Sequence, residues 1–199
     1  FIAELEKYEI PVFLRPRRFG KSLWCSVLEC YYDINRRDRF EELFANTDIG
    51  REPTPSRNSH LVLRFDFSKV PVKPSEKELE GAFDETCNNA FRVFAADYAD
   101  IHDFSDAWQE RTASTALQRI LRGAREGQTP PLNIIIDEYD NFTNQLLTAH
   151  QDRLYKDITT GESFLRSFYK VIKAGVGEGT VARVFVTGVL PVTMDDLTS

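Results

Sequence analysis

Four short runs of apolar residues stand out along the chain, and longer amphipathic segments separate them. The runs cover residues 10–14, 60–68, 132–137 and 182–189. The second run alternates apolar and other residues, whereas the third contains three consecutive isoleucines. Runs of this length, bounded by polar or turn-forming residues, are typical of strands. We therefore expect four β-strands.

The segments between these runs carry apolar residues at the three- and four-residue spacing of amphipathic helices. We expect helices over about 21–33, 79–98, 108 to 123 or 127, 143–155 and 163–174. Residues 46–59 and 190–199 are expected to be loops. Strands that alternate with helices predict an α/β fold, in which helices cover both faces of a mostly parallel central sheet.

Composition limits the class of protein. The chain has 199 residues, 42% of them hydrophobic and 12% aromatic, which is enough for one compact domain and too little for two large ones. We expect a single domain over residues 1–199. The net charge of −6 is unfavourable for general binding of nucleic acids, which depends on neutralising phosphates. A local contact with nucleic acid stays open, because arginines cluster near the start of the chain.

Three cysteines, an odd number without a CxxC pair, indicate a reduced protein of the cytoplasm. The sequence has no run of 18 apolar residues and no visible signal peptide, so we expect no membrane span. His60, His102 and His150 are far apart and are expected at the surface or in loops, outside any metal site. Because the chain starts at Phe1 and its fourth strand lies near the end, we expect a fragment that lacks both natural ends.

The sequence RPRRFGKS, Arg15 to Ser22, lies between the first strand and the first helix. It matches the phosphate-binding (Walker A) pattern GxxxxGK[ST] at Gly20, Lys21 and Ser22, but Arg15 stands at the first glycine position. Gly20 allows a left-handed backbone, and the amides that follow have no helical partner and point at an anion. Lys21 brings a positive charge to the β- and γ-phosphates, and Ser22 brings a hydroxyl to Mg²⁺.

We expect the whole loop and the start of the following helix to contact ATP. These residues are Arg15, Pro16, Arg17, Arg18, Phe19, Gly20, Lys21, Ser22 and Leu23. Phe19 is unusual in such a loop, and it is expected either to pack beneath the loop or to stack on the base. The motif alone leaves open a basic turn that binds no nucleotide.

Acidic residues follow the third strand in the sequence IIIDEYD. Asp137 is expected at the carboxyl end of a buried strand (Walker B), where it holds Mg²⁺ through a coordinated water. Glu138 is the expected base that orients the attacking water. Asp140 is interpreted as a turn residue in preference to a third acidic group of the site. Thr187 ends the fourth strand and is expected to sense the γ-phosphate, with an ordinary strand threonine as the alternative.

At these residues the chain resembles a known family. The segments FLRPRRFGKSL, IIIDEYDNF and VFVTGVLPVTMDDLTS are similar to motifs of the AAA-ATPase-like family of predicted ATPases, and the resemblance covers nearly the whole chain. In that family arginine is the rule at the position of Arg15. The resemblance implies a three-layer P-loop NTPase with an extra strand between the phosphate-loop strand and the acidic strand. It also implies a domain that continues beyond this sensor strand, often to a C-terminal nuclease-like domain.

The first hypothesis is a domain that binds ATP and hydrolyses it with Mg²⁺, and so powers or gates an attached effector. Its expected catalytic residues are Lys21, Glu138 and Thr187, and its expected metal ligands are Ser22 and Asp137. One alternative is a regulatory switch that holds ATP with little turnover, and another is a small-molecule kinase. The adjacent carboxylates favour activation of water over transfer to a hydroxyl. Assembly into a homo-oligomer stays open.

Overall fold

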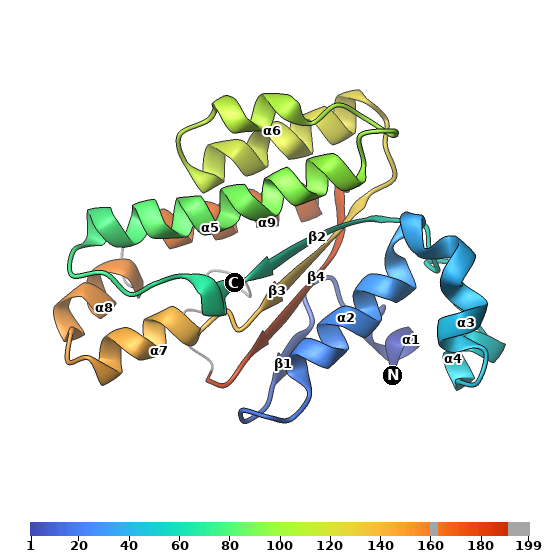
Figure 1. The fold of residues 1–199 in the computed structure, drawn as a ribbon, viewed down its shortest axis with the longest axis horizontal. Coiled ribbons are helices and arrows are strands. Elements are labelled where there is room, and N and C mark those ends of the chain that lie inside the picture. Colours follow the sequence, from blue (N-terminus) through green and yellow to red (C-terminus); the bar gives the residue numbers. More distant parts are fainter. Residues whose placement is uncertain (160–162, 191–199) are drawn as a thin grey trace.

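A sheet of four parallel strands forms the centre of the structure, a computed structural model that describes residues 1–159 and 163–190 (Figure 1). The strands are β1 (Val12–Leu14), β2 (Leu61–Asp66), β3 (Leu132–Asp137) and β4 (Val181–Gly188). Each of them coincides closely with one of the predicted apolar runs. The predicted α/β fold with a parallel sheet is confirmed.

The strand order is β1-β4-β3-β2, so the last of these strands in sequence lies between the first and the third. This strand is the one that the family resemblance places between the phosphate-loop strand and the acidic strand. The register sets Phe13 beside Thr187, and Asp66 beside Asp137. Because parallel strands point the same way, the residues that follow β1, β3 and β4 share one edge of the sheet.

Helices cover both faces of the sheet, and the alternation along β3 shows why. The covering helices are α2 (Lys21–Tyr32), α5 (Glu76–Asp97), α6 (Ala113–Glu126) and α9 (Phe164–Gly177). Ile134 and Ile136 belong to the large apolar cluster that also contains residues of α5, α6 and α9. Ile135 belongs to a second cluster with residues of α2, on the opposite face. In Figure 1, α5, α6 and α9 lie on one side of the sheet and α2 on the other.

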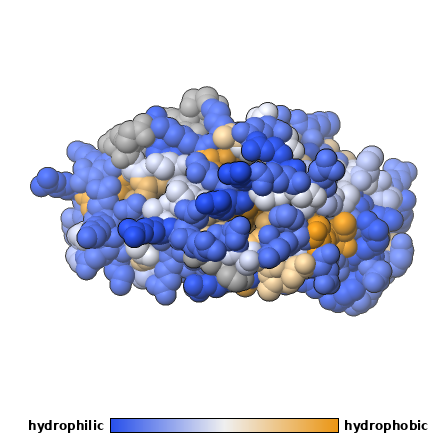
Figure 2. All heavy atoms as spheres, turned by 90° about the horizontal axis from the view of Figure 1, so that it is seen from above, coloured by the Kyte–Doolittle hydropathy of each residue, from blue (hydrophilic) through white to orange (hydrophobic). Residues whose placement is uncertain are grey.

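Shorter elements complete the described part of the chain. They are α1 (Ile2–Leu5), η1 (Ile34–Arg39), α3 (Phe40–Phe44), α4 (Asp48–Arg51), η2 (Phe67–Lys69), η3 (Ser105–Gln109), α7 (Asn141–Thr148) and α8 (Asp152–Thr159). Viewed from above, the surface is mainly hydrophilic with small apolar areas (Figure 2), because most large apolar side chains lie in the two clusters. In residues 1–159 and 163–190, no helix has the length and apolar character to cross a membrane.

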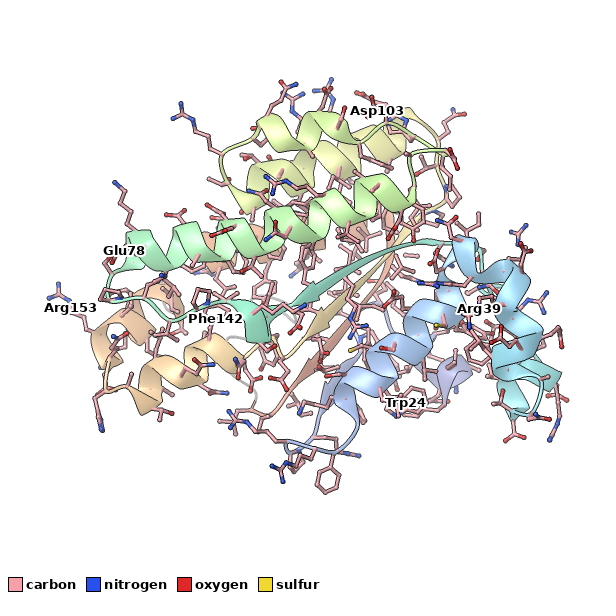
Figure 3. The ribbon with its side chains drawn as sticks, in the orientation of Figure 1. Trp24, Arg39, Glu78, Asp103, Phe142 and Arg153 are labelled. Carbon is pink, nitrogen blue, oxygen red and sulfur yellow. The ribbon has the colours of Figure 1, made fainter. Side chains whose placement is uncertain are left out.

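The prediction of one helix over 143–155 is wrong, because two helices, α7 and α8, occupy this region. His150 lies between them with a φ of 57°, a left-handed conformation that a continuous helix does not contain. The start of α7 is anchored by Phe142, which lies below α5 (Figure 3) with its ring 6.1 Å from that of Phe83. The break between α7 and α8 therefore follows from the left-handed backbone at His150 and from the packing of Phe142, and the apolar spacing reveals neither.

Two further boundaries differ from the prediction. The helix expected from residue 108 begins at Ala113, because the Thr112 hydroxyl accepts the amide of Thr115 and caps the helix there. The expected loop over 46–59 contains the short helix α4, which Thr47 caps through the amide of Gly50. The expected loop over 190–199 lies outside the described residues, except for its first residue.

Candidate functional site

The phosphate loop runs from the carboxyl end of β1 to the amino end of α2, as the sequence predicts. Arg18 and Gly20 have left-handed backbones, with φ of 69° and 74°. Gly20 takes this conformation without strain, whereas Arg18 does so at a cost. Gly20 also occupies the cap position of α2 and offers no side-chain cap. Within the described residues, the amides of Lys21, Ser22 and Leu23 have no partner, so they are available to an anion.

The ammonium group of Lys21 lies inside the loop and not in solvent. Its Nζ donates to the carbonyl oxygens of Arg15 at 3.2 Å and Pro16 at 3.3 Å, and the residue is only 4% exposed. None of the ion pairs found in the described part of the chain involves this lysine. Its full positive charge is therefore available to an anionic ligand.

Arg15 to Phe19, unlike Lys21, are exposed. The Arg15 guanidinium lies 5.2 Å from the centre of the Phe13 ring and donates to the carbonyl of Leu14, while the Arg15 amide donates to Gly188 of β4 at 3.1 Å. Arg17 and Arg18 are exposed. Phe19 is 66% exposed, so it does not pack beneath the loop, the first of the two arrangements expected for it.

The acidic end of β3 is tightly connected to the end of β4. Asp137 is 2% exposed, and its Oδ1 accepts the hydroxyl of Thr187 at 2.6 Å. The Thr187 oxygen in turn accepts the amide of Glu138 at 3.1 Å. Glu138 itself has a left-handed φ of 51° and a partly exposed side chain. The structure thus brings together three of the predicted site residues, and it uses the threonine hydroxyl both as donor and as acceptor.

A short path connects this acidic end to α2 and the phosphate loop. Burial, and then the negative charge of Asp137, raises the pKa of the Cys25 thiol to about 12, which places this second-turn residue of α2 near the carboxylate. The thiol therefore stays protonated at neutral pH, the form that is a poor nucleophile. The bond from the Arg15 amide to Gly188, the residue after Thr187, sets the loop and the acidic pair at one edge of the sheet.

Sequence reasoning missed one residue of the site, Arg64 in β2. Its guanidinium donates to Ser26 at 3.1 Å, to Glu29 at 3.0 Å and to Asp137 Oδ2 at 3.4 Å. It therefore joins the middle of α2 to the acidic end of β3. The available signal was a charged residue in the middle of an apolar strand, which has to find a partner when the strand is half-buried.

Asp140 has a larger structural role than the turn predicted for it. It is 1% exposed, and one carboxylate oxygen accepts the amides of Val189 at 2.9 Å and Leu190 at 2.7 Å, and the side chain of Asn144 at 2.8 Å. It fixes the chain that leaves β4. Gly188 allows this approach, because a Cβ at that position would lie 2.3 Å from the Tyr139 ring.

The residues present fit a magnesium ion held together with a nucleotide, and they do not fit a metal site made of protein alone. No group of three or more His, Cys, Asp or Glu side chains suited to a metal occurs among residues 1–159 and 163–190. Ser22 is exposed at the start of α2, and both oxygens of Asp137 already have protein partners. Mg²⁺ keeps several waters and uses one or two protein oxygens with substrate phosphates, which matches this donor set.

Comparison with known proteins gives one result. A family model described as a predicted AAA-ATPase matches residues 1–198. The chain matches no curated protein and no solved structure. The match covers almost all of the 199 residues, and the parallel sheet with its β1-β4-β3-β2 order agrees with a P-loop NTPase fold. The chain belongs to the AAA-ATPase-like family.

Proposed function

We propose that this domain binds ATP and hydrolyses it in the presence of Mg²⁺. One observation carries the proposal: among the described residues, the phosphate loop has free amides around a lysine that forms no ion pair, and it lies at the same sheet edge as the buried carboxylate of Asp137. Free amides at a helix start and a nearby ammonium group favour bound phosphates. A carboxylate at the neighbouring strand end supplies the acidic part of such a site.

Several residues of the loop and of the start of α2 have a proposed role in binding. The amides of Lys21 to Leu23 and the Lys21 ammonium hold the β- and γ-phosphates, which requires the ammonium to leave the carbonyls of Arg15 and Pro16. Arg17 and Arg18 are exposed and add positive potential beside the phosphates. Phe19, 66% exposed, offers an aromatic ring on which the base could stack, and Leu23, 69% exposed, offers a further apolar surface.

Ser22 and Asp137 are the proposed magnesium ligands, the carboxylate acting through water because both of its oxygens already bond to the protein. When bound, Mg²⁺ bridges the β- and γ-phosphates and neutralises the charge that develops there. Glu138 orients the attacking water and accepts its proton. Thr187 holds the Asp137 carboxylate and the Glu138 amide in position, and its role as a sensor of the γ-phosphate stays a prediction.

Thermal unfolding with and without Mg-ATP tests binding. At a ligand concentration about 100 times Kd, we expect the wild type to gain about 2.7 kcal/mol in free energy of unfolding. Lys21→Ala should lose most of this gain, because it removes the charge inside the loop. Lys77→Ala, at an exposed position of α5, is the matched control and should keep it. Absence of stabilisation in the wild type would overturn the proposal.

Phosphate release tests hydrolysis separately. Glu138→Gln should keep the stabilisation by Mg-ATP and lower the turnover by about 100-fold or more, because amide cannot accept the proton of the water. Glu178→Gln is the control, since that carboxylate pairs with Arg125 just before β4 begins, at the opposite edge of the sheet. Binding without turnover in the wild type would support the regulatory switch instead, and transfer of labelled phosphate to a small molecule would support a kinase.

A further inference from the structure

The carboxylate proposed to bind magnesium has a permanent cation beside it. Arg64 donates from Nη2 to Asp137 Oδ2 at 3.4 Å, and from Nη1 to Glu29 Oε2 at 3.0 Å and to Ser26 Oγ at 3.1 Å. The arginine side chain is 29% exposed and the Asp137 side chain 3%. A guanidinium is always charged in proteins, so it contributes one positive charge at this site under all ordinary conditions.

Arg64 affects Asp137 mainly through its positive charge and contributes little to the orientation of the carboxylate. The carboxylate is oriented by the short bond from Thr187, 2.6 Å long, whereas the bond from the arginine is 3.4 Å. The arginine is itself held by its two partners on α2 and does not depend on Asp137 for its position. Removing the guanidinium therefore changes the local potential while the main support of the carboxylate remains.

That potential opposes a second cation. Repulsion between one and two positive charges about 6 Å apart corresponds to a factor of about ten in affinity in a water-like dielectric. The phosphates of a nucleotide bring several negative charges to the loop and outweigh this single cation. We propose that Arg64 is a built-in counter-cation that weakens binding of free divalent metal at Asp137, so that the metal binds together with the nucleotide. This inference rests on the proposed function.

Electron paramagnetic resonance of free Mn²⁺, a stand-in for Mg²⁺, tests the inference without nucleotide and without activity. At low ionic strength, Arg64→Met should raise the affinity for Mn²⁺ by about threefold to tenfold. Arg64→Lys keeps the charge and should stay within about twofold of the wild type. Glu29→Gln removes the negative partner of the arginine, so it should weaken Mn²⁺ binding by at least about twofold, an effect of opposite sign.

Matched controls separate this effect from net charge and from folding. Arg119 lies on α6 and pairs with Glu110 at 2.7 Å. Arg119→Met should leave the affinity for Mn²⁺ unchanged. Arg64 and Glu29 line an open groove of about 490 Å³ beside β2, so solvent can fill the space that either substitution leaves. If Arg64→Met fails to fold, Glu29→Gln alone still gives a result, because its side chain is 28% exposed.

The inference is overturned if Arg64→Met leaves the affinity for Mn²⁺ unchanged or lowers it, or if Glu29→Gln raises it. A wild type that binds no measurable free Mn²⁺ agrees with the inference only when Arg64→Met brings binding into the measurable range. Binding of Mg-ATP by the wild type is measured in parallel by thermal unfolding. If Mg-ATP stabilises the wild type but Arg64→Met leaves the affinity for Mn²⁺ unchanged, the counter-cation role of Arg64 alone is rejected. If Mg-ATP does not stabilise the wild type, the proposed function is rejected.

Discussion

At the residue scale, one oxygen of a buried carboxylate accepts three hydrogen bonds. Asp140 accepts the amides of Val189 and Leu190 and the side chain of Asn144, all through Oδ2. The donors are neutral, so the negative charge is supported by hydrogen bonds alone. This junction holds the segment after β4 against the segment after β3, directly beside the pair formed by Asp137 and Thr187.

Replacing this carboxylate should weaken the whole domain. We expect Asp140→Ala to lower the free energy of unfolding by about 1–3 kcal/mol, because it leaves two part-buried backbone amides without an acceptor. Denaturation by urea measures the change. Asp100→Ala, at an exposed turn position, should change the free energy of unfolding by less than about 0.5 kcal/mol. Equal effects of the two substitutions would show that the three bonds are not important for stability.

Three elements meet at a single tyrosine hydroxyl. Tyr98, at the end of α5, donates to Asp33 Oδ1 at 2.9 Å and accepts the amide of Val62 at 2.8 Å. Asp33 ends α2, and Val62 lies near the start of β2. Because α2 and α5 cover opposite faces of the sheet, this link passes around the edge formed by β2. An edge strand has amides without a partner in the sheet, to which another chain could pair. The bond to Tyr98 occupies the amide of Val62 and prevents such pairing at this point.

Removal of one atom, the hydroxyl oxygen of Tyr98, breaks the link between these elements. Tyr98→Phe should lower the free energy of unfolding by about 1–3 kcal/mol, because the buried Val62 amide loses its acceptor and Asp33 Oδ1 keeps only the amide of Asn35. Tyr8→Phe is the control, since that ring is 58% exposed. Urea unfolding of both variants decides, and a loss below about 0.5 kcal/mol for Tyr98→Phe would mean that water replaces the hydroxyl.

Sequence reasoning works well for elements whose signal is local. The strands followed from apolar runs, and the start of α2 followed from Gly20 and the residues after it. It failed between 143 and 155, where the left-handed His150 ends one helix and the next begins two residues later. Helix spacing continues through such a reversal, so periodicity alone does not reveal it.

At the scale of the molecule, the strand order and the contacts across the sheet cannot be predicted from local sequence patterns. The position of β4 between β1 and β3 was expected from a family resemblance and not from the residues. The contact of Arg64 with Asp137 depends on the register of β2 on β3 and on the placement of α2. Arg64 lies 38 positions from Ser26 and 73 positions from Asp137 in the sequence. These contacts form only in the assembled structure.

The stability of the whole domain should depend on pH through His60. The sequence predicted a surface or loop position. His60 lies just before β2, outside the helices and strands, but a surface position is wrong, because the residue is 8% exposed and its ring contacts that of Tyr32. Burial lowers the pKa of His60 in the folded state, so the unfolded chain binds the proton first as the pH falls. Stability from this group is present above about pH 6.5 and is lost as the pH falls towards the folded pKa.

We therefore expect the free energy of unfolding of the wild type to decrease between about pH 7 and pH 5.5. His60→Gln should show a smaller decrease over the same range, because it removes the titrating group. Urea unfolding at several pH values measures both slopes. A wild-type slope equal to that of His60→Gln would mean that other groups cause the pH dependence.

The central place of β4 has a consequence for the order in which the domain assembles during synthesis. Until this strand emerges from the ribosome, β1 has no neighbour in the sheet, and β2 and β3 can form only a separate pair. The phosphate loop is made before this strand, and its support at Gly188 arrives some 170 residues later. A nascent chain therefore carries its phosphate-loop sequence through the synthesis of some 170 further residues before the loop gains this support from β4.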